Sequence, residues 1–297
     1  MSGGEAGGAA SPEERWLHAA NAEAAVFYRQ ELLRTSEPWP AALLRAWGVE
    51  TALDLGSAWQ VGYAPDSGTR LMDHLQKKGF GRETMMRAGL VSWTGDGVVD
   101  RYRDQLVVVS RDRRLDPVGF VGIDRGGAAR VITPETPVHR SSAALAGVLE
   151  QIDLLEAGAT AVLVDHPLDA IGIDLAVRYS NEPRHVGIPL IGSAVSTAQA
   201  QILHQYSTAS RVIVTVPGHL ADGERAIRNA IDLTQVFDNV RLLQRPAGPL
   251  LANPGRLRLL ADLVVKGPET GRRGGRKDSG NQHYYSSGIE DSGPSLN

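Results

Sequence analysis

Residues 78–124 read KGFGRETMMRAGLVSWTGDGVVDRYRDQLVVVSRDRRLDPVGFVGID, and this stretch decides the fold of the first half of the chain. A helical pattern ends at Ala88-Gly89-Leu90, and Gly95-Asp96-Gly97 has the composition of a tight turn. The apolar run Leu106–Val109 predicts a strand, and a second strand follows a polar turn and enters at Gly119-Phe120. A helix followed by strands that are joined through turns indicates a mixed α+β segment.

The chain before this stretch supplies further helices. Apolar residues recur at helical spacing over residues 16–34, and a short helix is expected over residues 43–48, after two prolines. Residues 58–64 alternate like a strand, and residues 71–78 return to a helical pattern. We therefore expect one α+β unit over residues 16–149.

Residues 150–249 follow a different pattern, in which strands and helices alternate. The segment Thr160–Val164 is a continuous apolar run, which suits a parallel strand buried on both faces. Further strands are expected at residues 188–191, 211–216 and 240–243, and helices at residues 170–179, 197–205 and 224–233. This alternation predicts an α/β domain built on a parallel sheet with right-handed crossovers.

The two ends of the chain lack the apolar residues that a packed core requires. Residues 1–15 and 267–297 are predicted to be disordered, and one further helix is expected within residues 250–266. The basic stretch at residues 272–277 has two interpretations, a solubilising tail or a non-specific contact to nucleic acid.

Composition excludes several classes of protein. The 297 residues are 42% hydrophobic and 22% charged, and the net charge is -3, so any nucleic-acid contact must come from a local basic patch. The chain has no cysteine, which excludes disulfides, thiolate zinc sites and a cysteine nucleophile. No signal peptide and no run of about 18 apolar residues is present, so we expect a cytoplasmic protein without a membrane partner.

Seven segments of the first half resemble motifs of the catalytic core of bacterial DnaG-type primases, in the same order and at similar spacing. They are FYR 27–29, VGYAP 61–65, LMDHLQKKGF 71–80, AGL 88–90, DRYR 100–103, VGF 118–120 and TPETP 133–137. The resemblance implies a role in RNA primer synthesis during DNA replication. It also implies single-stranded DNA or an RNA–DNA hybrid as a partner, with a replication protein as a further candidate. The zinc-binding and helicase-binding domains of that family have no counterpart in this sequence, so a core alone is expected.

The second half resembles the TOPRIM domain, the metal-dependent module that primases share with topoisomerases. Where that domain has a strand ending in Glu-Gly with an Asp nearby, this chain has Asp165 and Asp169. Where it has a strand ending in Asp-x-Asp, this chain has Pro217-Gly218-His219. Magnesium in nucleotidyl transfer requires hard oxygen ligands, which proline and histidine do not supply. The resemblance therefore implies a TOPRIM-like, Rossmann-type fold with a degenerate active site.

Three interpretations of the remaining acids stay open. Asp165, Asp169 and Asp222 are vestigial in the first, and the chain is catalytically inactive. In the second they form a rearranged site for Mg²⁺ or Mn²⁺ in an active primase, with Asp165 and Asp169 as metal ligands. In the third, His166 and His219 join Asp165 and Asp169 in a two-histidine carboxylate site.

Four arginines are candidates for contacts to nucleic acid or nucleotide. Arg101 and Arg103 stand where the family has arginines that face template and nucleotide phosphates, and alternate residues of one strand would share a face. The alternative is that both pair with neighbouring aspartates on the surface. Arg130 and Arg140 lie beside positions at which the family has lysines, whereas Ile123 replaces a family arginine.

These observations lead to one hypothesis and two alternatives. The hypothesis is a primase-like nucleic-acid-binding protein that is catalytically degenerate. The alternatives are an active metal-dependent primase and a protein-interaction module of a replication or plasmid-transfer system.

Overall fold

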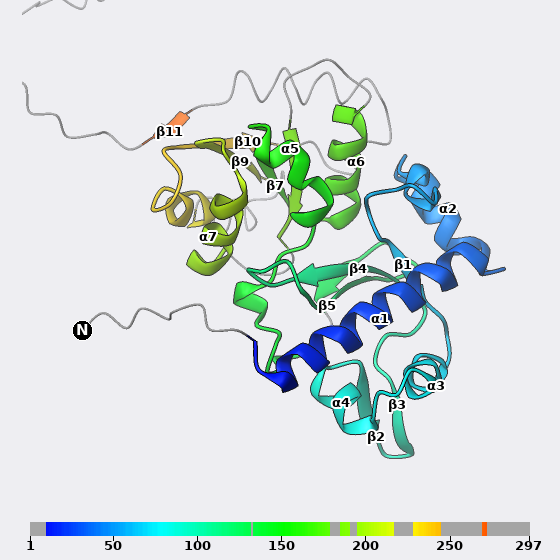
Figure 1. Ribbon diagram of the computed structural model, residues 1–297. Coiled ribbons are helices and arrows are strands. Elements are labelled where there is room, and N and C mark those ends of the chain that lie inside the picture. Colours follow the sequence, from blue (N-terminus) through cyan, green and yellow to red (C-terminus); the bar gives the residue numbers. More distant parts are fainter. Residues whose placement is uncertain are drawn as a thin grey trace, which may run out of the picture.

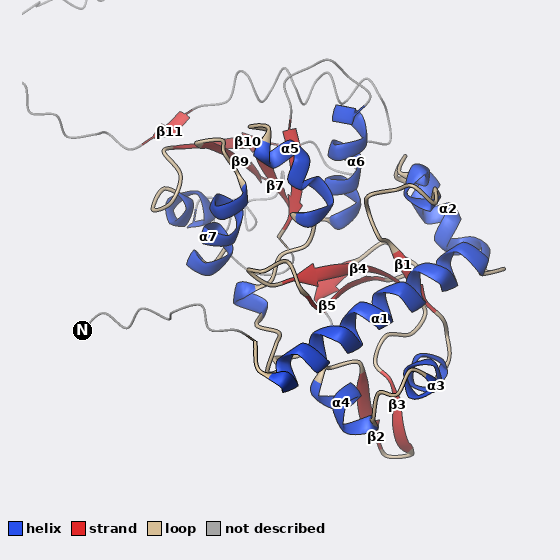
Figure 2. Ribbon diagram, viewed as in Figure 1, coloured by secondary structure: helices blue, strands red, loops and turns tan. Residues whose placement is uncertain are grey.

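The computed structural model describes residues 10–131, 133–178, 185–190, 195–216, 228–244 and 269–271. Two larger sheets with helices around them and one two-stranded hairpin make up this part of the chain (Figures 1 and 2). The first contains strands from residues 62–131, and the second contains strands from residue 160 onward.

The long helix α1 (Pro12–Arg34) organises the first half. Ser11 begins it with a capping box, in which its hydroxyl accepts from the backbone of Glu14 and the Glu14 carboxylate accepts from the backbone of Ser11. The helix lies along the four-stranded sheet (Figure 1). A Cβ on Gly62 of the first strand would lie 2.5 Å from Cβ of Tyr28, so the glycine permits the close approach of helix and sheet.

The first sheet has the order β1-β4-β5-β6 and is antiparallel throughout. Its strands are β1 (Gly62–Ala64), β4 (Gln105–Arg111), β5 (Pro117–Ile123) and β6 (Ala129–Val131). The other elements of this half are α2 (Pro38–Ala46), η1 (Glu50–Leu53), α3 (Arg70–Lys77), α4 (Arg82–Arg87) and a hairpin of β2 (Val91–Thr94) with β3 (Gly97–Asp100). The predicted turn, strands and α+β character of residues 78–124 are confirmed.

The second sheet has the order β11-β10-β9-β7-β8, and β7 to β10 run parallel. Its strands are β7 (Thr160–Val164), β8 (His185–Pro189), β9 (Arg211–Val216), β10 (Asn239–Gln244) and β11 (Glu269–Gly271). The helices of this half are α5 (Ile152–Glu156), α6 (Pro167–Arg178), α7 (Thr197–Tyr206) and a helical segment at residues 228–233. Two 3-10 turns, η2 (Ser141–Ala143) and η3 (Leu149–Gln151), lie in the connection between the halves. The predicted α/β fold is confirmed.

Both faces of β4 and of β7 are buried, which joins the two halves through a common core. Val107 and Val109 of β4 pack with α1, whereas Leu106 and Val108 pack in one cluster with Val162 of β7. The opposite face of β7 packs in a separate cluster with α5 and α7. The indole of Trp59 adds a polar link, because its Nε1 donates to Oδ2 of the buried Asp174 in α6 at 3.0 Å.

The structure differs from the sequence-based expectations at several places. Residues 12–15 lie in the segment predicted to be disordered, but they form the first turn of α1, because Ser11 and Glu14 make a capping box there. Only residues 62–64 of the predicted strand 58–64 pair with a neighbour, since the segment before them turns to bury Trp59. Residues 101 and 103 lie in the connection between β3 and β4, not on a strand. Residues 269–271 form β11 inside the segment predicted to be disordered, because pairing with the edge of β10 uses only the backbone.

Several expectations lie outside the described residues. They are the helix expected within residues 250–266, the basic stretch at 272–277, and residues 217–222 after β9. The domain boundaries stay predictions. Among the described residues, no helix is both long enough and apolar enough to cross a membrane.

Candidate nucleic-acid and metal sites

The carboxyl ends of β7 and β9 lie at one edge of the parallel sheet. Leu163 of β7 is opposite Val214 of β9, so the two strands end close together. Asp165 follows β7 directly and is partly exposed, and α6 begins at Pro167. Ligands of open α/β sheets bind at this edge. Asp165 therefore lies where an acid could contribute to a site.

Asp169 lies close by in the sequence but is turned into the protein. It is in the first turn of α6, its side chain is 0% exposed, and its backbone N–H donates to the carbonyl of His166 at 3.1 Å. A carboxylate in the first turn of a helix interacts favourably with the helix dipole. Asp169 is thus placed to stabilise the start of α6.

The ring of His166 has a structural role that uses both of its nitrogens. Nδ1 accepts from the backbone N–H of Leu168 at 3.1 Å, so the proton resides on Nε2, which donates to the carbonyl of Gly127 at 2.8 Å. The ring also stacks on Trp47, with centroids 4.2 Å apart. Both nitrogens of His166 are therefore used within the protein, and His166 has no nitrogen left to bind a metal ion. The predicted two-histidine site is wrong in including His166. His166 instead fastens the start of α6 to the turn between β5 and β6.

The rest of the predicted metal site depends on residues that follow β9. Pro217, His219 and Asp222 lie outside the described residues. Within the described ranges, neither Asp165 nor Asp169 belongs to a group of three His, Asp or Glu side chains whose ligand atoms converge. Of the family's acidic pattern, two aspartates remain, and one of them is buried. This donor set does not fit the magnesium site that the resemblance implies.

Arg101 and Arg103 have different surroundings. The guanidinium of Arg101 donates to the carbonyl of Gly89 at 2.8 Å and to that of Val91 at 3.3 Å, which ties the connection after β3 to the start of β2. Arg103 is exposed and makes no hydrogen bond or ion pair with any residue that the structure describes. The two arginines therefore do not share the face of one strand, and Arg103 is the more accessible of the two to a phosphate, so their joint contact with one anion stays a prediction.

Asp100 is a buried acid that the sequence did not single out. Its two carboxylate oxygens accept from the backbone N–H groups of Leu71 and Met72 at 2.8 and 2.9 Å, in the first turn of α3. Burial raises the pKa of Asp100 to about 6, against the lowering effect of these hydrogen bonds and of the nearby Arg103 charge. The only sequence signal is its position at the end of a strand, which does not reveal a contact with α3.

A second group gathers around Asp104, which has a φ of 50° and lies between β3 and β4. Its carboxylate accepts from Nε1 of Trp39 at 3.0 Å, from the hydroxyl of Tyr63 at 3.3 Å and from Nε of Arg125 at 2.5 Å. Burial alone would raise the pKa of Asp104, but the hydrogen bond and charge of Arg125 outweigh it and lower that pKa. Asp104 thus pairs with Arg125 and not with Arg101 or Arg103.

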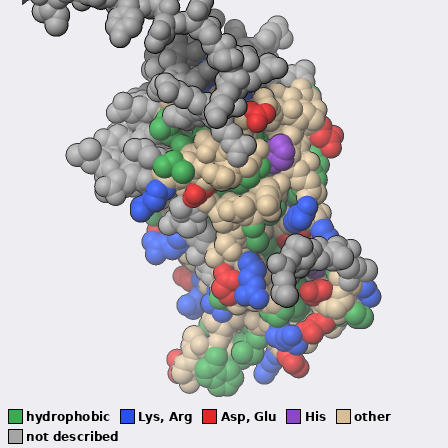
Figure 3. All heavy atoms as spheres, turned by 90° about the vertical axis from the view of Figure 1, so that its left-hand side faces the viewer, with side chains coloured by type: hydrophobic (Ala, Val, Ile, Leu, Met, Phe, Trp, Pro, Cys, Tyr) green, Lys and Arg blue, Asp and Glu red, His purple; other side chains and the backbone are tan. Residues whose placement is uncertain are grey.

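Arg130, on β6, and Arg140 are exposed, and each forms an ion pair with an acid close to it in the sequence. Arg130 lies 3.6 Å from Asp124, and Arg140 lies 3.5 Å from Glu135. Pairs this exposed contribute about 0–1 kcal/mol to stability, so an anionic ligand can compete for both arginines. On the face shown in Figure 3, basic and acidic side chains are interspersed, and no single-sign surface dominates it.

The comparisons with known proteins agree with this geometry. Residues 27–151 match the family model described as the DNA primase catalytic core, N-terminal domain. The DNA primase of Mycobacterium tuberculosis is 34% identical over 168 residues, which are 54% of this chain and 26% of that protein. The DNA primase of Geobacillus stearothermophilus is 29% identical over 234 residues, covering 75% of this chain and 36% of that protein. The chain therefore spans only about a quarter to a third of the length of these relatives.

Solved structures extend the likeness into the second half. The RNA polymerase domain of the M. tuberculosis primase DnaG, solved in complex with double-stranded DNA, superposes with a TM-score of 0.69 at 25% identity. That match covers 85% of this chain and 81% of the other. The E. coli primase catalytic core, at 20% identity and a TM-score of 0.67, shares the fold. Residues 27–151 are thus similar to the N-terminal domain of the DNA primase catalytic core, and the chain as far as the parallel sheet shares the fold of the DnaG primase core.

Proposed function

We propose that this chain is a primase-related protein that binds nucleic acid in DNA replication and no longer synthesises primers. The observation that carries the proposal is a primase-core scaffold, continuous from residue 27 into the parallel sheet, in which Pro217-Gly218-His219 replaces the acidic pair. A primase fold without the metal ligands favours a protein that still binds nucleic acid but no longer catalyses nucleotidyl transfer. Contacts from arginine to phosphate do not require the cation, whereas the transfer reaction does.

The exposed arginines supply the binding surface in this proposal. Arg103 has an unoccupied guanidinium within the described structure, and Arg130 and Arg140 hold only exposed ion pairs. A phosphate can replace the carboxylate in such an exposed ion pair with little loss of protein stability. Arg101 is not part of this surface, because its guanidinium is held by two backbone carbonyls. Single-stranded DNA, an RNA–DNA hybrid or both are the proposed ligands, and the cytoplasm is the proposed location.

Fluorescence anisotropy tests the binding proposal directly. Labelled single-stranded DNA, duplex DNA and RNA–DNA hybrid are titrated with the protein at two salt concentrations. We expect binding that weakens with salt, and a smaller salt dependence in an Arg103→Ala, Arg130→Ala double variant, because each lost phosphate contact reduces the slope by about one. Arg211→Ala is the matched control, since this exposed arginine lies at the amino end of β9, at the opposite end of the strand from the candidate site. Equal losses in control and double variant would contradict the proposed surface.

The active-primase alternative is tested by primer synthesis on single-stranded DNA with Mg²⁺ or Mn²⁺. We expect no product from the protein, because the described residues offer no converging set of acids at the end of β7. Product that disappears in Asp165→Ala would overturn the degenerate interpretation and establish a rearranged site. A protein that binds none of the three nucleic acids at low salt would favour the protein-interaction module, and affinity capture by replication proteins would then be the next experiment.

A further inference from the structure

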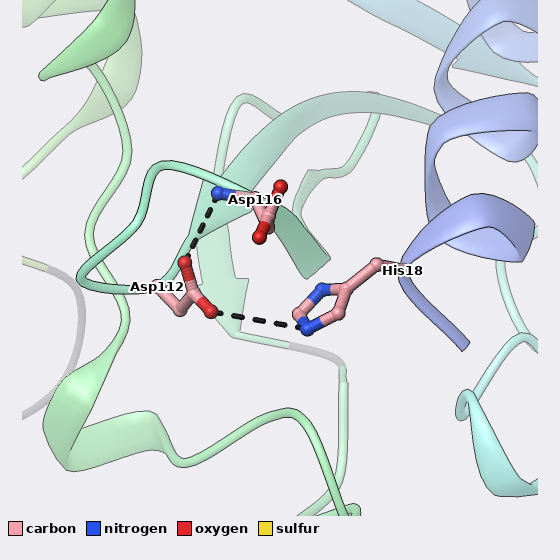
Figure 4. A group of neighbouring side chains, drawn as sticks. All are labelled: His18, Asp112 and Asp116. Atoms are coloured by element: carbon pink, nitrogen blue, oxygen red, sulfur yellow. Dashed lines mark hydrogen bonds and ion pairs between the residues drawn. The ribbon is translucent and has the colours of Figure 1, made fainter. Parts of the chain in front are cut away.

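A second group of metal-ligand side chains lies away from the parallel sheet, where α1 meets the turn between β4 and β5. His18 of α1 faces Asp112 and Asp116 of the turn (Figure 4). One ligand atom from each residue lies within 4.8 Å of the other two, and all three side chains are partly buried. No other group within the described residues meets this criterion.

The tautomer of His18 is set by a backbone carbonyl. Nδ1 lies 3.3 Å from the carbonyl oxygen of Pro117, and a carbonyl only accepts, so the proton resides on Nδ1. Nε2 then presents its lone pair toward Oδ2 of Asp112, 3.9 Å away. This distance is too long for a hydrogen bond but allows one ion to contact both atoms, because bonds from Zn²⁺ to nitrogen and oxygen are about 2.0–2.2 Å. A histidine held through its other nitrogen by a carbonyl is the usual arrangement of a metal ligand.

The carboxylate of Asp112 is oriented by hydrogen bonds from the backbone, and that of Asp116 lies beside the same space. Oδ1 of Asp112 accepts from the backbone N–H groups of Arg114 and Asp116 at 2.8 and 3.0 Å, which directs Oδ2 toward His18. The backbone N–H of Asp112 donates to the carbonyl of Asp116 at 3.0 Å and closes the turn. The carboxylate of Asp116 accepts no hydrogen bond from the described residues, and it lies beside the same space (Figure 4).

The chemistry of these donors selects the kind of ion. One imidazole nitrogen and two carboxylate oxygens suit first-row divalent transition metals, whereas Mg²⁺ and Ca²⁺ prefer oxygen ligands alone. Three protein ligands on a partly exposed turn leave positions for water. We propose that His18, Asp112 and Asp116 form a site for a divalent transition-metal ion such as Zn²⁺ or Co²⁺, which fastens the β4–β5 turn to α1.

Isothermal titration calorimetry with Zn²⁺ tests the site in the full chain. We expect one saturable site whose affinity falls about tenfold or more in both His18→Ala and Asp116→Asn, since each removes a ligand. Asp116→Asn keeps the test independent of folding, because its carboxylate makes no hydrogen bond that the described structure records. The matched controls are His204→Ala and Asp96→Asn, which lie outside the group and should leave the affinity unchanged.

Thermal unfolding separates a metal site from a plain ion pair between His18 and Asp112. An ion that binds only the folded protein raises the melting temperature as its concentration increases. We expect this rise with Zn²⁺ in the unaltered protein and a much smaller one in Asp116→Asn. The absence of saturable Zn²⁺ binding, or binding that neither His18→Ala nor Asp116→Asn weakens, would overturn the proposal.

Discussion

Arg101 and Arg103 are two residues apart, yet their guanidinium groups meet different surroundings. Arg101 is held by the carbonyls of Gly89 and Val91, and Arg103 extends into solvent. The motif DRYR at residues 100–103 therefore combines a buried cap on α3, a structural arginine and an exposed arginine. Residue types alone would assign both arginines to the ligand.

Replacing each arginine by alanine should affect a different property, stability for Arg101 and affinity for DNA for Arg103. Arg101→Ala should lower the free energy of unfolding by about 1–2 kcal/mol, because two carbonyls lose a charged donor. Arg103→Ala should change that free energy by less than about 0.5 kcal/mol while lowering affinity for DNA. Urea denaturation of both variants, with anisotropy on the same samples, provides the comparison. A stable Arg101→Ala protein with lost binding would contradict the structural role of Arg101.

Asp100 gives the protein a defined pH dependence. Its pKa is about 6 in the folded state and 3.8 in the reference state, so the unfolded chain ionises first as pH rises. Ionisation therefore reduces the free energy of unfolding between pH 3.8 and about 6, by at most about 3 kcal/mol, and the effect is complete above the folded pKa. Asp100→Asn should remove this fall, as measured by urea denaturation across that range. Asp96→Asn, on the exposed hairpin turn, should retain it.

At the scale of elements, the distance between α1 and the first sheet depends on Gly62. A Cβ there would lie 2.5 Å from Cβ of Tyr28 and 2.9 Å from its backbone carbon, neither of which can rotate away. Gly62→Ala should therefore displace α1 and lower the free energy of unfolding by about 1–3 kcal/mol.

The matched control is Gly81→Ala, at the start of α4, where no atom lies within 4 Å of the added Cβ. Thermal unfolding of both variants, with the near-ultraviolet signal of the aromatic residues on α1, measures the difference. Equal stability of the two variants would show that α1 adjusts without cost.

At the scale of the molecule, the two sheets are joined by a common apolar cluster and by a buried ion pair. Nε of Arg111, on β4, donates to Oε1 of Glu150 at 3.3 Å, and both side chains are less than a tenth exposed. Burial raises the pKa of Glu150, and the charge of Arg111 opposes that rise. Glu150 lies in the η3 turn that leads into the parallel sheet, so the pair connects the halves.

Replacing one partner of this ion pair should lower the free energy of unfolding more than replacing both partners. Glu150→Ala leaves Arg111 buried without its carboxylate and should lower the free energy of unfolding by about 3–5 kcal/mol. The double variant Arg111→Met, Glu150→Met should be less damaging than Glu150→Ala, because no buried charge remains. Urea denaturation followed by fluorescence and by far-ultraviolet circular dichroism should give coincident transitions, since the halves share a core. Two separate transitions would mean that the halves unfold independently.

Local patterns in the sequence determined the strands at residues 160–164 and 211–216 and the α/β character of the second half, because burial on one or both faces leaves a periodic pattern of apolar residues along the chain. The likeness to primases came from the order and spacing of motifs within residues 27–137. The tertiary structure alone decided that Arg101 binds carbonyls, that Asp104 pairs with Arg125, that both nitrogens of His166 are used and that His18 meets Asp112. Most of these contacts join residues from different elements of the fold, and polar side chains carry no periodic signal of their partners. Their roles therefore follow from packing, which brings the segments together only after the apolar pattern has placed the helices and strands.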